Sequence, residues 1–256
     1  MRQLLIIVIF FLVASSCNSS NGEKTDKIKI FISWPGAEAK PHYWWNSSSL
    51  KPDGIEPKII EMVMDAAGLE YEYVSNYKFN GKGDPRIEVL KSGNADISIR
   101  AITINEERKE HVLFSTPYYT DGLGILIKKE SGIAEISDLK SKKVYAHGFT
   151  TAYDWCESNL KESELITDKN NENPYVNPDI LLEQGQIDAY VLDYTFLKEM
   201  ERQNSQLTVL PKKFTEEPLG IAISKENIEL QKVINEALKT LQESGALIQI
   251  ISKYEK

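Results

Sequence analysis

Hydrophobic positions along this chain follow two periods in turn, one typical of strands and one typical of helices. Dense β-branched runs predict buried strands, and amphipathic stretches such as 57–67 predict helices with one apolar face. Because the two kinds of element alternate, we expect an α/β fold with largely parallel sheets. The predicted strands are 28–33, 97–104, 122–127, 144–146, 187–192 and 219–224, and the predicted helices are 57–67, 87–91, 151–159, 195–203 and a final pair separated near Gly245.

The N-terminal segment has the pattern of an export signal. A short positive region precedes an apolar run over 4–13, which is too short to span a bilayer and has the length of a signal-peptide core. Small residues then precede Cys17, an arrangement that resembles the lipobox of bacterial lipoproteins and implies lipidation of Cys17; ordinary signal cleavage is the alternative. We expect a signal peptide over 1–16 and a flexible tether, beginning at Cys17, over 17–26.

Composition narrows the class of partner. The chain has 256 residues, enough for one large or two small domains, and a formal net charge of −8. That charge argues against nucleic acid or an anionic membrane surface as the partner. Its three histidines lack metal-ligand spacing, and neither a Gly-rich phosphate loop nor a nucleophile elbow is present. These patterns predict no metal or cofactor. We also expect a small-molecule ligand and a monomer.

Carboxylate-binding chemistry is indicated where the strand ending near Thr103 meets a short helix. Asn105 has the character of a helix N-cap, and two glutamates follow in the first turn, where the helix dipole favours anions. Arg108 departs from this pattern, because a cation near a helix start is favourable only beside an anion. With the Thr103 hydroxyl and free helix N–H groups, its guanidinium could hold a carboxylate. A surface ion pair with a neighbouring glutamate is the alternative.

The segment 103–118 resembles the signature of the bacterial extracellular solute-binding proteins, family 3, which are the polar amino-acid receptors of ABC importers. Further motifs extend the resemblance over nearly all of the chain after the tether, at 54–56, 188–193, 217–225 and 235–245. The resemblance implies a two-lobed periplasmic-binding-protein-like (type II) fold, in which two crossing strands form a hinge. It assigns 27–121 and 219–256 to lobe one, and 122–218 to lobe two.

In this family the ligand lies in a cleft between the lobes, and the resemblance implies which residues bind its charged groups. The ligand carboxylate would bind Arg108 and Thr103 from lobe one. Thr150 and Thr151 would complete this clamp from lobe two, at the start of a helix. Asp193 would bind the ammonium group. A helix N-cap is the alternative role for Asp193.

Three more residues are implied in the ligand site: Tyr43, Phe79 and Ala101. Tyr43 is the preferred aromatic residue against the ligand, and Phe79 is a further candidate. The alternative for both rings is core or lobe packing.

Arg86, Arg100 and His147 are candidates for ligand specificity. Arg86 opens a helix that also begins with Arg in the receptors for acidic amino acids, and Arg100 stands where many relatives have a small residue. Either one facing the cleft would favour a ligand with a second negative charge, so acidic amino acids are slightly favoured over neutral polar ones. A rim salt bridge is the alternative for each arginine. Phe149 replaces the usual Gly and adds bulk beside the clamp.

The resemblance also implies a biological setting. The protein would reside in the periplasm or at the cell surface, held at the membrane through Cys17, and would deliver its ligand to an ABC permease. One alternative is a dehydratase on the same fold, which needs a general acid such as Glu38, Glu183 or Glu217. Another alternative is a ligand-sensing lipoprotein that is not coupled to import.

Overall fold

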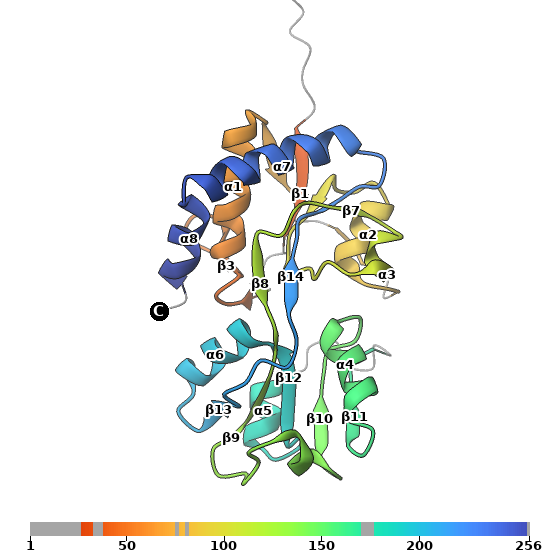
Figure 1. The fold of residues 1–256 in the computed structure, drawn as a ribbon, viewed down its shortest axis with the longest axis vertical. Helices are drawn as coiled ribbons and strands as arrows, with labels where there is room; N and C mark the ends of the chain where they lie inside the picture. The colour runs from red at the N-terminus through yellow and green to blue at the C-terminus, as the bar shows by residue number, and fades with distance from the viewer. Residues whose placement is uncertain (1–26, 33–37, 75–76, 80–81, 170–176, 255–256) are drawn as a thin grey trace, which may run out of the picture.

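The structure is a computed structural model that describes residues 27–32, 38–74, 77–79, 82–169 and 177–254. The predicted signal peptide, tether and lipidated Cys17 lie outside these residues. The described chain forms two lobes, one above the other in Figure 1, and each lobe is built on a five-stranded sheet.

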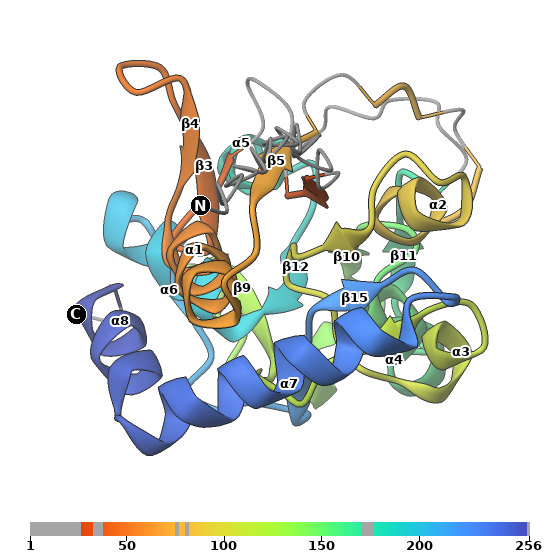
Figure 2. The same cartoon turned by 90° about the horizontal axis from the view of Figure 1, so that it is seen from above.

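Lobe one contains the sheet with strand order β5-β1-β6-β15-β7 and the helices around it. Seen from above, α7 crosses this lobe beside α1, with which it packs (Figure 2). A small sheet of β2, β3 and β4 precedes α1 in the chain. The bounds of these elements are β1 (Ile28–Phe31), β2 (Glu38–Ala39), β3 (Tyr43–Asn46), β4 (Lys51–Asp53), α1 (Ile55–Ala67), β5 (Tyr71–Tyr73), α2 (Pro85–Lys91), β6 (Ile97–Ser98), α3 (Glu106–Lys109), β7 (Leu113–Phe114), β15 (Ala222–Ile223), α7 (Ile228–Glu243) and α8 (Ala246–Tyr254).

Lobe two contains the sheet with strand order β11-β10-β12-β9-β13. Its core is a separate cluster of apolar side chains, which includes the fully buried Ile125, Val144 and Val191. The bounds of its elements are β9 (Leu123–Lys128), a 3₁₀ helix η1 (Ile136–Leu139), β10 (Lys143–Tyr145), α4 (Thr151–Asn159), β11 (Glu164–Ile166), α5 (Pro178–Glu183), β12 (Ala189–Asp193), α6 (Tyr194–Gln203) and β13 (Leu207–Val209).

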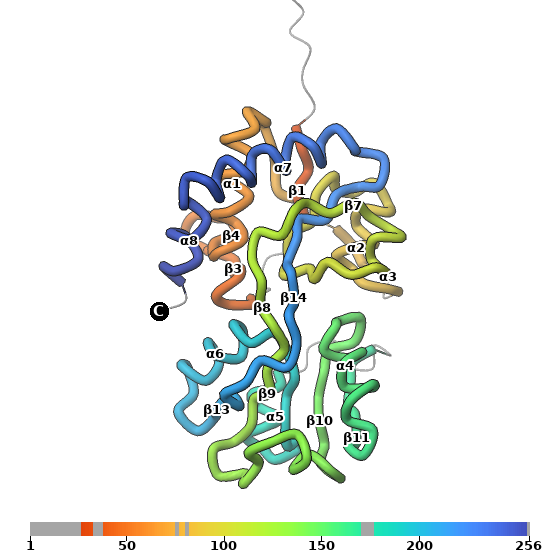
Figure 3. Tube along the Cα trace, in the orientation of Figure 1, coloured from red at the N-terminus to blue at the C-terminus, as the bar shows by residue number. Residues whose placement is uncertain are grey.

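Two antiparallel strands connect the lobes and run side by side between them (Figure 3). They are β8 (Tyr119–Asp121) and β14 (Glu217–Leu219). The two-lobed α/β fold with a hinge of two crossing strands is therefore confirmed. The residue boundaries of the lobes stay a prediction.

The sheets are mixed, so the expectation of largely parallel sheets was wrong. In lobe two, β10 pairs in parallel with β11 and β12, whereas β9 is antiparallel to both β12 and β13. The crossing chain explains the difference. β8 continues directly into β9, so β9 enters lobe two from lobe one, and β14 leads into β15, so β15 enters lobe one from lobe two. β9 therefore runs antiparallel to β12, and β15 runs antiparallel to β6, because β12 and β6 each end toward the opposite lobe.

The predicted strands 97–104 and 219–224 are shorter than expected. Only Ile97–Ser98 pairs in β6, although Ile99 and Ile102 are fully buried. The hydrophobic run therefore indicates that this segment is buried, but most of it is irregular and not part of a strand. The second strand is interrupted at Gly220, where a Cβ atom would approach the Ile104 side chain to 2.7 Å. No helix within the described ranges is long and apolar enough to cross a membrane.

Candidate ligand-binding site

Arg108 is positioned by the short helix α3 and is buried. The prediction that Asn105 caps this helix is confirmed, because its side-chain oxygen accepts a hydrogen bond from the Arg108 backbone N–H at 2.9 Å. The Arg108 side chain turns back and donates to the Thr103 carbonyl oxygen at 2.9 Å. Only 8% of Arg108 is exposed, so the surface ion pair considered from the sequence does not describe it.

A second arginine lies beside Arg108 and shares its contacts. The Arg86 guanidinium forms a bidentate pair with Asp84, with Nε–Oδ1 and Nη2–Oδ2 distances of 2.8 and 2.6 Å. Arg108 Nη2 approaches the same Asp84 Oδ2 at 3.4 Å. Asp84 was not among the residues singled out from the sequence. Its signal was local, since an Asp directly before Pro85 is a typical helix start, and Asp84 is indeed the N-cap of α2.

Both arginines also bind lobe two. Arg86 and Arg108 donate to the Phe149 carbonyl oxygen at 3.2 and 3.3 Å, and Arg86 donates to the Ala101 carbonyl oxygen at 3.1 Å. Phe149 and Ala101 have φ values of 60° and 45°, a left-handed backbone that residues with a side chain rarely adopt. Strained backbone of this kind is concentrated at functional sites. Here it directs two carbonyl oxygens toward the arginine pair.

The arginine pair carries an excess of positive charge. Burial and the like charge of Arg86 lower the pKa of Arg108 to about 10. Burial would raise the pKa of Asp84, but the charge of Arg86 and the hydrogen bonds from it hold that pKa below its usual range. Two guanidinium groups and one carboxylate leave a formal charge of +1 among these three side chains. A single bound carboxylate would neutralise it.

On the lobe-two side, Thr150 and His147 shape the loop between β10 and α4. The Thr150 hydroxyl donates to the His147 carbonyl oxygen at 2.6 Å and accepts from the Tyr153 N–H at 3.2 Å, so it caps α4. Thr151 is the first, half-buried residue of that helix. His147 Nδ1 lies 2.8 Å from an oxygen of Asp168, another residue that the sequence patterns did not single out. Burial would raise the Asp168 pKa, but hydrogen bonding and the charge of His147 lower it.

Asp193 ends β12 with its carboxylate unused by the helix that follows. Its side chain makes no capping bond to α6; instead Asp121, from the hinge, accepts the Thr195 N–H at 3.0 Å. The Asp193 Oδ1 atom is buried and has no hydrogen-bond partner among the described residues. Burial and the nearby charge of Asp121 raise the pKa of Asp193 to about 7. A cationic group beside it would reverse that effect.

Tyr43 lies in the core of lobe one. Only 5% of it is exposed, and its hydroxyl accepts a hydrogen bond from Arg100 Nε at 2.7 Å. The Arg100 guanidinium carbon also lies 5.1 Å from the centroid of the Tyr43 ring. Phe79 is half-buried, and Ala101 is buried. The packing of Tyr43 therefore agrees with the alternative role considered from the sequence, which is packing in the core and not contact with the ligand.

A buried polar group holds the strained Ala101 in place. Glu56, fully buried at the start of α1, accepts the Ala101 N–H at 2.5 Å and the Tyr118 hydroxyl. His42 Nδ1 lies 3.8 Å from the same Glu56 oxygen, and its ring stacks on Phe196 of lobe two at 4.4 Å between centroids. These contacts form a second point at which the two lobes meet.

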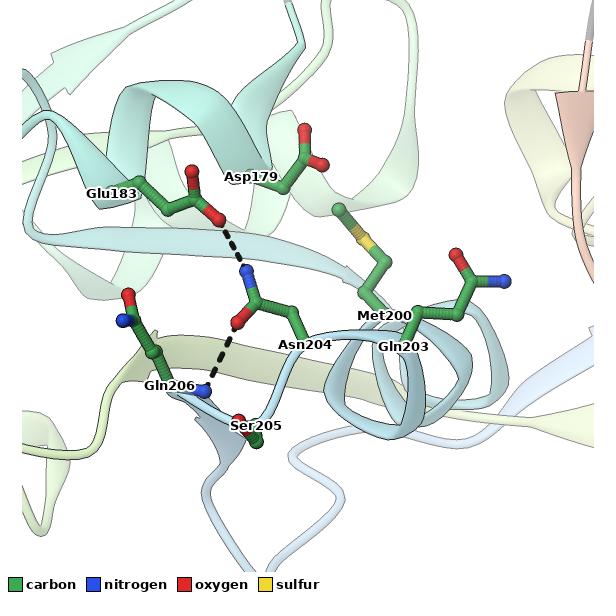
Figure 4. A pocket seen from close by; sticks show the side chains of 7 residues that line it. All are labelled: Asp179, Glu183, Met200, Gln203, Asn204, Ser205 and Gln206. Carbon is green, nitrogen blue, oxygen red and sulfur yellow. Dashed lines mark hydrogen bonds between the residues drawn. The ribbon is translucent and has the colours of Figure 1, made fainter.

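A separate surface cavity of about 600 Å³ lies between α5 and α6 of lobe two (Figure 4). Glu183 lines it and accepts a hydrogen bond from Asn204, which in turn accepts one from the Gln206 N–H at 3.0 Å. None of the residues predicted to bind the ligand lines this cavity. We therefore centre the candidate site on the arginine pair and Asp193. Among the described residues, no group of three or more His, Cys, Asp or Glu side chains could hold a metal ion.

Two α/β lobes joined by two crossing strands, with buried charged side chains at their facing ends, define the solute-binding class of protein. The chain belongs to the bacterial extracellular solute-binding proteins, family 3, whose family model matches residues 36–256. The resemblance drawn from residues 103–118 is thus confirmed.

Known relatives give the same class. The chain is 34% identical to the ABC transporter glutamine-binding protein GlnH of Bacillus subtilis over 67% of its own length and 62% of that relative. It is 32% identical to the L-cystine-binding protein TcyJ of Escherichia coli, covering 84% and 78% of the two chains. Among solved structures, an ancestral arginine-binding protein bound to arginine is 27% identical, with a TM-score of 0.75 and coverage of 89% and 97%.

Proposed function

We propose that this protein is an extracytoplasmic receptor that captures a polar amino acid between its lobes and delivers it to an ABC importer. The observation that carries the proposal is the charge arrangement at the facing ends of the lobes. Arg108 and Arg86 share one Asp84 and keep a formal charge of +1, while a buried oxygen of Asp193 has no hydrogen-bond partner within the described part of the chain. A zwitterion carries the two charges that such a site lacks, a carboxylate and an ammonium group.

The identity of the side chain is a finer part of the proposal. The sequence-based preference for acidic amino acids needs a second cation in the site, and Arg86 and Arg100 are its candidates. Arg86 is bound to Asp84 and Arg100 to Tyr43, so both arginines already have polar partners in lobe one. The relatives named above bind glutamine, cystine and arginine, which share the α-amino carboxylate and differ in the side chain. This comparison supports amino acids as the class of ligand.

The setting of the protein completes the proposal. Its family is extracellular, and relatives serve ABC transporters, which supports a location in the periplasm or at the cell surface beside a permease. Anchoring through a lipidated Cys17 and a monomeric state also belong to the proposal. A dehydratase is the competing function. Of its candidate acids, only Glu217 is buried at the hinge, whereas Glu38 is exposed and Glu183 lines the separate cavity.

The ligand class can be tested by thermal-shift screening of the mature domain. A ligand that binds only the folded state stabilises it by RT ln(1 + [L]/Kd), so a concentration one hundred times Kd adds about 2.7 kcal/mol. We expect stabilisation by one or a few polar amino acids, and the ranking of glutamate against glutamine tests the acidic preference. Turnover of a cyclic hydroxy acid, together with no response to any amino acid, would favour the dehydratase.

Ligand affinity should depend on pH through Asp193. Its pKa of about 7 in the ligand-free protein means that lower pH protonates the carboxylate that the ammonium group needs. An ammonium group lowers this pKa, so binding releases a proton, and affinity should fall by up to about tenfold per pH unit below 7 and level off above it. Calorimetry between pH 5.5 and 8 measures this slope. The nearby His42 also has a shifted pKa, which burial lowers but the hydrogen bond and charge of Glu56 raise. Asp193→Asn is therefore the control, and it should flatten the dependence of affinity on pH.

A further inference from the structure

Asp84 lies between the two arginines of the site. It is assigned neither to the ligand carboxylate nor to the ligand ammonium group. Its two oxygens accept hydrogen bonds from Nε and Nη2 of Arg86, and Oδ2 also approaches Arg108 Nη2 at 3.4 Å. The exposed fractions of the Asp84, Arg86 and Arg108 side chains are 12%, 14% and 10%. The three charges are therefore shielded from most of the solvent that would otherwise screen them.

The number of charges in this cluster determines how many carboxylates can be bound without an excess of either sign. With Asp84 ionised, the cluster has a charge of +1, and the α-carboxylate of one amino acid brings it to zero. A second carboxylate on the ligand would then leave a negative excess. Without the Asp84 charge, the cluster has a charge of +2, and a ligand with two carboxylates would bring it to zero.

We propose that Asp84 is a specificity-determining residue, which sets the relative affinity of the site for ligands with one and with two carboxylates. The inference rests on the proposed function, since it concerns the same site. It goes further by naming the residue of this chain that counters Arg86. Asp84 acts on the ligand through its charge on the arginine pair, so its effect should appear in the ratio of two affinities.

Asp84 also has a structural role that a test must leave intact. Its Oδ1 accepts the Arg86 backbone N–H at 3.0 Å and caps α2. Asparagine caps helices about as well as aspartate, so Asp84→Asn removes the charge and keeps the cap. Asp138 offers a matched control in lobe two. It too accepts backbone N–H groups at a helix start, from Ala134 and Glu135, and its removal takes away one negative charge far from the arginines.

The test is calorimetry of wild type, Asp84→Asn, the double variant Asp84→Asn/Arg86→Gln and Asp138→Asn. L-glutamine and L-glutamate are the probes because they have the same shape and differ by one carboxylate. Asp84→Asn should shift the ratio of the two dissociation constants toward glutamate by at least about tenfold, given the strength of charge interactions at a few ångströms. The double variant restores the charge of +1 and should return the ratio to within about threefold of wild type.

An equal change for both probes in Asp84→Asn, or the same shift in Asp138→Asn, would overturn the inference. Failure of both probes on wild type would count against glutamine and glutamate as ligands and leaves Asp84 testable. In that case thermal shifts with propionate and succinate, which lack the ammonium group, replace the calorimetry. Succinate should gain on propionate in Asp84→Asn, and an unchanged difference between them would overturn the role of Asp84.

Discussion

Replacing Arg108 with alanine should abolish ligand binding at ordinary concentrations and leave the protein folded. Arg108 is buried and hydrogen-bonded, and in the proposed complex it faces the ligand carboxylate. Removing one partner of such a charge pair costs about 2–5 kcal/mol, which corresponds to a loss in affinity of about thirty-fold to several thousand-fold. Calorimetry with the amino acid found by screening measures this loss.

The neighbouring Lys109 provides the matched control for this experiment. It lies on the same short helix, its side chain is 48% exposed, and it pairs with Glu106. Lys109→Ala should therefore bind as wild type does, because surface pairs contribute little. An Arg108→Ala protein that binds within about threefold of wild type would remove Arg108 from the ligand site.

Replacing Asp193 with asparagine should lower affinity sharply without lowering the melting temperature. At pH 8 the Asp193 carboxylate is mostly ionised, and its loss should cost about thirty-fold or more if it binds the ammonium group. Stability should not fall, because Asp121, and not Asp193, caps α6. The raised pKa of Asp193 also means that its ionised form opposes folding at pH 8, so the neutral asparagine removes a destabilising charge from the ligand-free protein. Calorimetry at pH 8 and thermal unfolding of the ligand-free protein give the two quantities.

Asp188, which directly precedes β12, is the control for Asp193 at the end of that strand. Its carboxylate is 40% exposed and accepts the Lys143 N–H, so Asp188→Asn removes a charge away from the arginine pair. Affinity should be unchanged in that variant. A clear drop in melting temperature with wild-type affinity in Asp193→Asn would instead make Asp193 a structural residue.

Local features of this fold were correctly predicted from the sequence. The helix 151–159 has the predicted bounds, and its cap, Thr150, bonds to a backbone N–H three residues away. Asn105 caps α3 as expected, and the final two helices are separated at Gly245, which has a φ of 75°. Each of these depends on side chains and backbone groups within one or two helical turns. Such interactions depend on residues that are close together in the sequence, so they can be predicted without the rest of the fold.

Strand direction and strand extent could not be obtained in the same way. A run of buried apolar residues such as 97–104 reports that the segment is inside the protein, and Ile99 and Ile102 are fully buried without pairing in a strand. Whether a strand pairs, and in which direction, is determined by hydrogen bonds to distant segments. β15, for example, joins β6 and β7 only because the chain returns through the hinge.

The sequence by itself determined the class of the protein, because the motif around Thr103 and Arg108 and the hydrophobic periods are local properties. Only the tertiary structure decided which charges meet. Asp84 lies 24 residues before Arg108, and Phe149 lies 41 residues after it, yet all three contact one another or the shared Arg86. The free energy of a buried charge depends on every neighbour within a few ångströms, and those neighbours come from both lobes.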